Sequence, residues 1–450
     1  MFRSLAVRNF RLFVVGQLFS VTGTWTMFVA QDWLVLSLSG DSGTQLAVVT
    51  TLQFLPVLLL TLHGGTLADA RNRRRLLLAA NATAAALSAL VYGAAVAAQP
   101  RLWQIYVFAA AIGVVNAVEG PARLAFVGEM VGPDLLPNAS ALSGAYFNVA
   151  RVGGPALAGL LIGRFGPVPV FALNAVSYAA TVTSLLLMRE SELHRPPGPR
   201  PRRTGGVRDG LAHVRGRRDL LLPLTLLACV CLFGFNFQLA LPLLAKTEFG
   251  VGAESFGLLT SAVAAGSLAA ALVTTARTGR PRAGVVIGAA TAFGLCETGA
   301  GLTPTFASTL PALAAVGFTA TYFAQATNHH VQLGTDRRYR GRVIALYLLI
   351  LQGAAPLGSL PLSRLIELLG PRAALWTGGT LSLTAAVTAL CLHRAGTRRT
   401  RSSTEKAERP RPDSNLWPLS IAGDGDGDGR TFTALPRPDP MGGQEEPTAR

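Results

Sequence analysis

Three ionisable residues interrupt long apolar stretches of the chain, and they are the first candidates for chemistry: Asp32, Arg151 and Glu297. If these stretches cross a bilayer, a charge there costs at least about 2.5–3.5 kcal/mol, so each side chain should face a polar pathway or a partner. A carboxyl group in a partly dry site could exchange protons. We therefore predict proton or substrate contacts for Asp32 and Glu297. A structural pair or an external cap is the alternative for Asp32. Arg151 could bind an anionic ligand group or pair with an acid.

Polar side chains within other apolar stretches extend this set of proton or substrate candidates. They are Asn116, Asn148 and Gln325. Glu119 and Arg123 are one helical turn apart, which favours a local ion pair over a role in transport.

These side chains must be positioned by the apolar stretches themselves, of which the sequence contains twelve. Each has about 17–27 residues, and about 20 helical residues cross a hydrocarbon layer of roughly 30 Å. Within that layer only helices and closed barrels satisfy their backbone groups, and the alternating pattern of barrel strands is not seen. We therefore predict an all-α membrane protein with twelve transmembrane helices, over residues 12–38, 46–67, 76–98, 102–118, 140–163, 168–188, 220–245, 256–275, 284–302, 309–328, 343–363 and 373–392.

Composition and charge agree with this prediction. The chain is 50% hydrophobic and 14% charged, and its net charge is +16. With the N-terminus inside, the cytoplasmic loops and N-terminal arm hold 24 Lys and Arg residues, the external loops 5 and the C-terminal tail 10. Positive residues favour the cytoplasmic side, so we predict a multi-pass plasma-membrane protein with both termini in the cytoplasm. The basic charge then reports orientation and lipid contact, and no nucleic-acid partner is expected.

The twelve stretches fall into two similar sets of six. A polar segment rich in Arg, Pro and Gly divides them, and the basic turn near Arg73 recurs near Arg280. We predict two pseudo-symmetric six-helix bundles, 1–188 and 220–393, joined by a cytoplasmic linker, 189–219. The polar residues 394–450 are predicted to be a disordered cytoplasmic tail.

The sequence does not indicate an enzyme. It contains no Walker phosphate-binding motif, and its four cysteines all fall within apolar stretches. No metal-ligand set or catalytic triad pattern is evident. We therefore expect neither a cofactor nor a metal site.

The turn after the second stretch carries a recognisable motif. It reads Gly-Thr-Leu-Ala-Asp-Ala-Arg-Asn-Arg-Arg over residues 65–74. This resembles the signature of the major facilitator superfamily, in its expected place between helices 2 and 3. The stretches GTWTMFVAQDWLVLSLSG, GPARLAFVGEMV and RGRVIALY resemble its enterobactin-exporter-like and macrolide-efflux-like branch. The resemblance implies the same two-bundle fold.

The resemblance also implies a cytoplasmic gate made of Gly65, Asp69, Arg73 and Arg74. In the superfamily this acid faces the start of helix 11, a contact that must break when the cytoplasmic side opens. Alternatively, the arginines could only set the topology.

A second motif, in the fifth stretch, is similar to the signature of the superfamily's exporters. Its residues are Gly154, Pro155 and Gly159. The resemblance implies that this element seals the pathway against leak. Plain close packing between helices would need the same residue types.

Together, these features predict a secondary active transporter, a proton-coupled exporter of hydrophobic or amphipathic small molecules such as a drug, an antibiotic or a siderophore-like metabolite. Its expected partners are the small-molecule substrate, protons and the lipid bilayer, and a monomer is expected. Two alternatives stay open: an importer of a small nutrient on the same fold, and a non-transporting membrane sensor or assembly partner.

Overall fold

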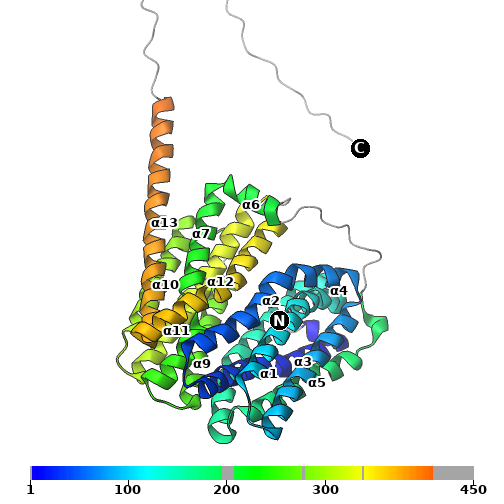
Figure 1. The fold of residues 1–450 in the computed structure, drawn as a ribbon. Coiled ribbons are helices and arrows are strands. Elements are labelled where there is room, and N and C mark those ends of the chain that lie inside the picture. Colours follow the sequence, from blue (N-terminus) through cyan, green and yellow to red (C-terminus); the bar gives the residue numbers. More distant parts are fainter. Residues whose placement is uncertain (1–2, 195–206, 276–278, 337–338, 409–450) are drawn as a thin grey trace, which may run out of the picture. The chain divides into compact units, whose positions relative to one another are not determined.

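The computed structural model describes residues 3–194, 207–275, 279–336 and 339–408, and helices make up almost all of this part (Figure 1). The α-helices are α1 (Arg8–Ser39), α2 (Gly43–Ala70), α3 (Arg73–Ala97), α4 (Leu102–Phe165), α5 (Val168–Leu186), α6 (Val207–Arg215), α7 (Arg218–Phe233), α8 (Phe237–Leu243), α9 (Ala253–Thr275), α10 (Ala283–Gly301), α11 (Phe306–Gly334), α12 (Arg340–Leu369) and α13 (Pro371–Glu408). Short turns of other helix types are η1 (Arg3–Ala6), η2 (Glu190–Glu192) and η3 (Leu244–Glu248).

The predicted transmembrane helices are confirmed. In the described part of the chain, 11 helical segments are long and apolar enough to cross a membrane. One of them, α4, contains two of the predicted stretches, 102–118 and 140–163. Another runs through α7, α8 and η3 and corresponds to the predicted stretch 220–245.

The two parts of α4 run in opposite directions because the chain turns at Gly132. This residue has φ 72°, a left-handed conformation that glycine adopts without steric cost. Before the turn, Tyr106 hydrogen-bonds Gln45 near the start of α2, and Glu129 reaches Arg73 at the start of α3. After the turn, Asn138 accepts a hydrogen bond from the backbone of Ser4.

The seventh predicted helix is broken, which the sequence did not predict. Residues 234–236 separate α7 from α8, and Asn236 has φ −101° and ψ 35°. Its side-chain amide donates to the carbonyl of Leu232, 2.9 Å away. Gly358 of α12 lies so close that an added Cβ would be 2.2 Å from that same carbonyl oxygen.

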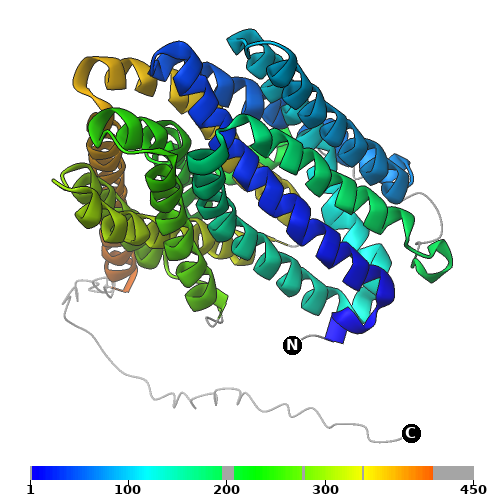
Figure 2. The same cartoon turned by 90° about the horizontal axis from the view of Figure 1, so that it is seen from below.

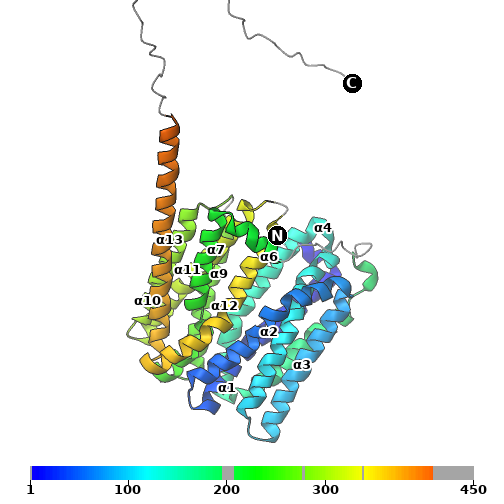
Figure 3. The same ribbon diagram turned by 45° about the horizontal axis from the view of Figure 1, so that its top comes forward.

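Helices of the first six predicted stretches pack mainly on one another. Helix α1 packs on α4 and α5, and α3 packs on the same two helices. Figure 2 shows α1, in dark blue, between α5 and the second part of α4. In the second half, α11 packs on α7, α9 and α10. The halves meet where α2 packs on α12 (Figure 3) and where α4 packs on α9. The described residues up to 396 form one compact unit.

Two ends of this unit are distinguished below. The basic end is where Arg73 and Arg280 lie, at the starts of α3 and α10. The opposite end is where Asp41 and Lys246 lie, after α1 and within η3.

Helical segments lie within the predicted linker and tail. The linker 189–219 contains η2 and α6, and Val214 of α6 is buried against the rest of the unit. The predicted disordered tail, 394–450, stays a prediction, and α13 continues as a helix into it, to Glu408. A helix that begins in an apolar stretch can extend into polar residues such as these, because each added residue gains a backbone hydrogen bond. Residues 409–450 lie outside the described part.

Candidate functional site

The predicted gate motif forms a compact ion-pair cluster at the basic end. The guanidinium of Arg73 lies 2.7 Å from a carboxylate oxygen of Glu129 and 3.0 Å from one of Asp69. It also donates to the carbonyl of Ala68 at 3.1 Å. The side chain of Arg73 is only 6% exposed, so it ties the end of α2 and the first part of α4 to the start of α3.

The rest of the motif fixes neighbouring helix ends. The side chain of Asn72 caps α3 by accepting a hydrogen bond from the backbone N–H of Arg75 at 3.3 Å. Arg74 donates to the carbonyl of Leu185 at 2.8 Å and forms an ion pair with Glu190. It therefore joins α3 to the end of α5. The predicted contact between Asp69 and the start of the eleventh predicted stretch, 343–363, which lies in α12, stays a prediction.

The two adjacent glycines of α2, Gly64 and Gly65, differ in their surroundings. An added Cβ at Gly65 would meet nothing within 4 Å. At Gly64 it would lie 2.2 Å from the carbonyl oxygen of Ala117, so α2 and α4 approach closely only because this residue lacks a side chain.

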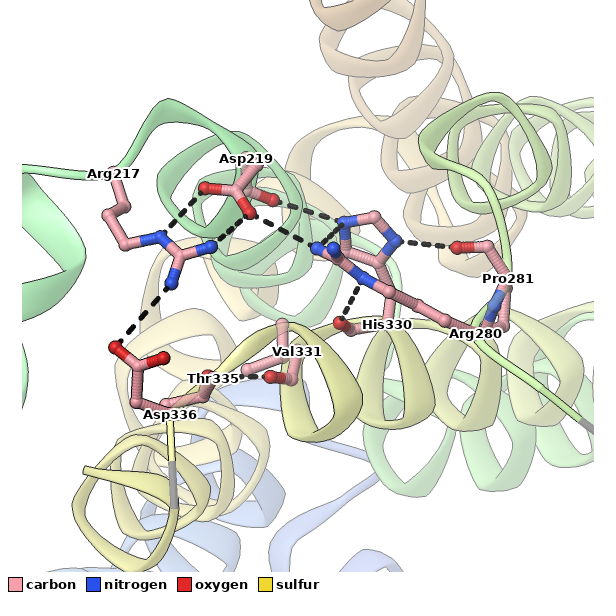
Figure 4. Close-up of polar contacts among 8 residues, drawn as sticks. All are labelled: Arg217, Asp219, Arg280, Pro281, His330, Val331, Thr335 and Asp336. Atoms are coloured by element: carbon pink, nitrogen blue, oxygen red, sulfur yellow. Dashed lines mark hydrogen bonds and ion pairs between the residues drawn. The ribbon is translucent and has the colours of Figure 1, made fainter. Parts of the chain in front are cut away.

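The second half has a corresponding cluster at its basic end (Figure 4). Arg280 donates to a carboxylate oxygen of Asp219 at 3.1 Å and to the carbonyl of His330 at 3.2 Å. The ring of His330, 4% exposed, lies between two backbone carbonyls: Nδ1 is 2.7 Å from that of Pro281, and Nε2 is 3.1 Å from that of Asp219. Arg217 also pairs with Asp219, at 2.8 Å. The cluster thus joins α7, α10 and α11.

The exporter motif of the fifth stretch lies in two helix contacts. Gly154 faces α1, where an added Cβ would be 2.6 Å from the Cβ of Trp25. Gly159 faces α9, where an added Cβ would be 2.9 Å from the Cα of Glu254. The carbonyl of Pro155 lies 2.4 Å from the position of a Cβ on Gly257. These residues therefore let α4 approach both α1 of its own half and α9 of the other half.

At the opposite end, polar and aromatic contacts join the two halves. Lys246 forms an ion pair with Asp41 at 2.5 Å, and its ammonium lies 5.4 Å from the ring centre of Trp33. Trp33 in turn stacks on Phe256 of α9, with 6.2 Å between ring centres.

Contacts between α2 and α12 continue this junction. Thr44 hydrogen-bonds Glu367, and the hydroxyls of Thr51 and Ser359 are 3.1 Å apart. Sequence reasoning did not identify these residues, since a junction between remote segments has no local pattern.

The buried carboxyl groups predicted as proton sites belong to different halves, Asp32 to α1 and Glu297 to α10. Asp32 of α1 is 8% exposed, and its side chain makes no hydrogen bond or ion pair with any described residue. Glu297 of α10 is 1% exposed, and its Oε2 has no hydrogen-bond partner among the described residues. Glu297 lies at the break after α7, because a Cβ on Gly234 would be 2.8 Å from that oxygen.

The remaining candidates make local or helix-joining contacts. Arg151 places its guanidinium 5.7 Å from the ring centre of Trp25. Asn148 donates to the carbonyl of Gly144 in its own helix, at 2.8 Å. Gln325 of α11 accepts a hydrogen bond from Thr274 of α9.

The predicted role of Asn116 stays a prediction, whereas a predicted ion pair is seen in the structure. Asn116 is half-buried in α4. The predicted local pair of Glu119 and Arg123 is confirmed, with Oε1 and Nε 3.1 Å apart.

Known proteins are similar to this chain over most of its length. The sequence profile of a family described as transmembrane secretion effector matches residues 1–416. The multidrug efflux pump Tap of Mycobacterium tuberculosis is 27% identical over 381 residues, which are 78% of this chain and 85% of that protein. The staphyloferrin A transporter of Staphylococcus aureus is 26% identical over 255 residues, 56% of this chain. That match spans 63% of the staphyloferrin transporter.

Solved structures support the same fold. A bacterial homologue of the human lysosomal transporter Spinster, crystallised in an inward-facing and occupied conformation, superimposes with a TM-score of 0.68. It is 14% identical, and the match covers 86% of this chain and 97% of that one. These findings confirm the resemblance drawn from the sequence motifs. The chain belongs to the transmembrane secretion effector family and is a secondary transporter of the major facilitator type.

Proposed function

We propose that this transporter exports hydrophobic or amphipathic small molecules across the plasma membrane in exchange for protons. The observation that carries the proposal is Asp32, a buried carboxyl without a hydrogen-bond or ion-pair partner among the described residues. It precedes Trp33, which stacks on Phe256 in the junction of the two halves at the opposite end. A carboxyl at such a junction becomes accessible when the junction parts, so it can bind a proton in one state and release it in another. The efflux activity in the name of Tap supports the direction.

In this proposal the basic end faces the cytoplasm, and both termini lie there. Arginines gather at this end in both halves, as Arg73, Arg74, Arg217 and Arg280 do. Positive residues on the cytoplasmic side are the general rule for helical membrane proteins. The opposite end then faces the exterior. In this proposal the structure corresponds to a state in which the two halves contact each other on the exterior side.

The two six-helix bundles, 1–188 and 220–393, act in this proposal as units that rock against each other. The ion-pair clusters at the basic end fix helix ends within each half, which favours motion of each half as one body. Small residues at the contact of α4 with α9, such as Gly159 and Gly257, allow close approach there. One chain contains both halves, so a monomer is sufficient for transport.

Flux across vesicles tests the proposal. The full chain is reconstituted in liposomes that contain the dye ethidium, and a pH gradient of either sign is imposed. We expect the dye to move only in the direction opposite to that in which protons flow down their gradient. Asp32→Asn should remove this dependence of dye movement on the pH gradient. Asp134→Asn makes the same chemical change at an exposed position after the turn of α4 and serves as the control.

Two outcomes would contradict the proposal. Asp32→Asn with wild-type coupling would exclude the proton role, and Glu297→Gln would then be the next variant. Movement of dye and protons in the same direction would favour the importer.

A further inference from the structure

A set of aromatic rings and arginines joins α1 to both parts of α4 in the first half. The ring of Trp25 packs edge-to-face on Phe147, with 6.2 Å between centres, and on Phe28 at 5.9 Å. The guanidinium of Arg151 lies 5.7 Å from the centre of Trp25, and that of Arg123 lies 5.9 Å from the centre of Phe147. Two cations therefore flank one pair of packed rings.

The two arginines differ in how their charge is balanced. Arg123 pairs with Glu119 at 3.1 Å. Arg151 makes no hydrogen bond or ion pair with any described residue, and among these residues its guanidinium lies over the ring of Trp25. A cation over a ring face contributes about 0.5–2 kcal/mol, but it leaves the N–H groups of the guanidinium without acceptors.

An arginine in that position is stabilised by an anionic partner. Arg151 lies in the membrane-spanning second part of α4, where an unpaired charge is costly. It is half-buried, as are Trp25 and Phe147, so part of each side chain remains accessible. A carboxylate fits a guanidinium with two parallel hydrogen bonds, and the adjacent rings offer an apolar surface to the remainder of the same molecule.

We propose that Arg151, Trp25 and Phe147 form a binding site for the acidic group and the apolar body of amphipathic carboxylic acids, so that such acids are among the molecules that are transported. This inference rests on the proposed transport function and names a class of its substrates. Trp25 and Asp32 are seven residues apart on α1 and share one face, about 10.5 Å apart along the axis. The anion site and the proton site therefore follow one another along a single helix.

Binding of three probes that share one ring system tests the site. The full chain in lipid nanodiscs is titrated with 1-naphthoate, 1-naphthalenemethanol and 1-naphthylmethylammonium, which carry an anionic, a neutral and a cationic group. Isothermal titration calorimetry gives the three dissociation constants. We expect 1-naphthoate to bind at least tenfold more tightly than either of the others. Arg151→Gln should remove this preference, and Arg151→Lys should retain part of it.

The control removes the same charge elsewhere on the same helix. Arg164→Gln lies at the exposed end of α4 and should bind 1-naphthoate as the wild type does. If Arg151→Gln does not assemble, Arg151→Lys and Trp25→Leu carry the test, and Trp25→Leu should weaken all three probes. Equal binding of the three probes by the wild type, or an undiminished preference in Arg151→Gln, would overturn the inference.

The same preparation separates this inference from the proposed function. Proton-driven movement of ethidium without any preference in binding for 1-naphthoate would support the exporter and contradict the anion site. Binding of 1-naphthoate that depends on Arg151, with no proton-driven flux of either compound, would support the anion site and contradict the exporter.

Discussion

The basic end and the opposite end of the helix unit are held together in different ways. At the basic end, the described ion pairs of Arg73 with Glu129 and of Arg280 with Asp219 each lie within one half. At the opposite end, the pair of Lys246 with Asp41 joins one half to the other. In the proposed function, charges at the basic end hold the helices of each half together, whereas contacts at the opposite end belong to one state of the transport cycle. Substitutions at the two ends should therefore change different quantities.

The largest expected effect lies at the basic end, in the stability of the first half. Arg73→Gln leaves the carboxylate of Glu129 without its ion-pair partner in a site where Arg73 is 6% exposed. Loss of one partner of a buried pair costs about 3–5 kcal/mol. We expect a lower thermal unfolding midpoint in detergent, measured by the fluorescence of tryptophan.

The second half supplies the matched control for that measurement. Arg280→Gln removes a pair whose side chains are 38% and 41% exposed, so its cost should be about 1 kcal/mol or less. Equal losses in the two variants would contradict the view that burial decides the strength of the two clusters.

A smaller effect is expected where α4 meets α9. Gly159→Leu would bring a Cβ to 2.9 Å from the Cα of Glu254, and backbone atoms of α9 cannot move aside as a side chain does. We expect cargo flux to fall about tenfold while the protein still assembles, because the halves can no longer approach there. Gly153→Leu is the control, since a Cβ at that position meets nothing within 4 Å. Similar flux in the two variants would show that the close approach at Gly159 is not needed for transport.

The smallest effect is expected for the ion pair at the opposite end. The side chains of Lys246 and Asp41 are 23% and 38% exposed, and such pairs contribute about 0.2–1 kcal/mol. Lys246→Ala should therefore change the balance of conformations by at most about fivefold. A double-mutant cycle with Asp41→Ala, read out as cargo flux, isolates the coupling between the two side chains. Strictly additive effects would indicate that the pair does not contribute to that balance.

The sequence predicted the membrane helices well because apolar length is a local property. The break between α7 and α8 was missed, since residues 234–236 lie in an apolar stretch, and the close approach of Gly358 to this segment joins positions remote in sequence. Helix α6 was missed because the linker's Pro, Gly and Arg content obscured its short apolar pattern. Tyr339 stacks on His213 of that helix, with 4.2 Å between ring centres, a contact between segments remote in sequence.

Prediction of the candidate site was limited in the same way. Asp69 and Arg73 are four residues apart, and their pairing follows from a local motif. Glu129 lies 56 residues from Arg73, and only the fold brings the two together. The close packing of Gly64 on α4 also required coordinates, because adjacent positions of a helix face different sides.

The distance between the halves at the opposite end tests the central claim most directly. Spin labels are attached at Ser37→Cys and Thr247→Cys in a chain without its native cysteines. Pulsed electron paramagnetic resonance in nanodiscs then reports the distance between the two labels. We predict a short and a long distance whose proportions change between pH 8 and pH 5, and the same proportions at both pH values when Asp32→Asn is added. A single distance at both pH values in a preparation that transports cargo, or an unchanged pH response in Asp32→Asn, would contradict proton-coupled alternating access.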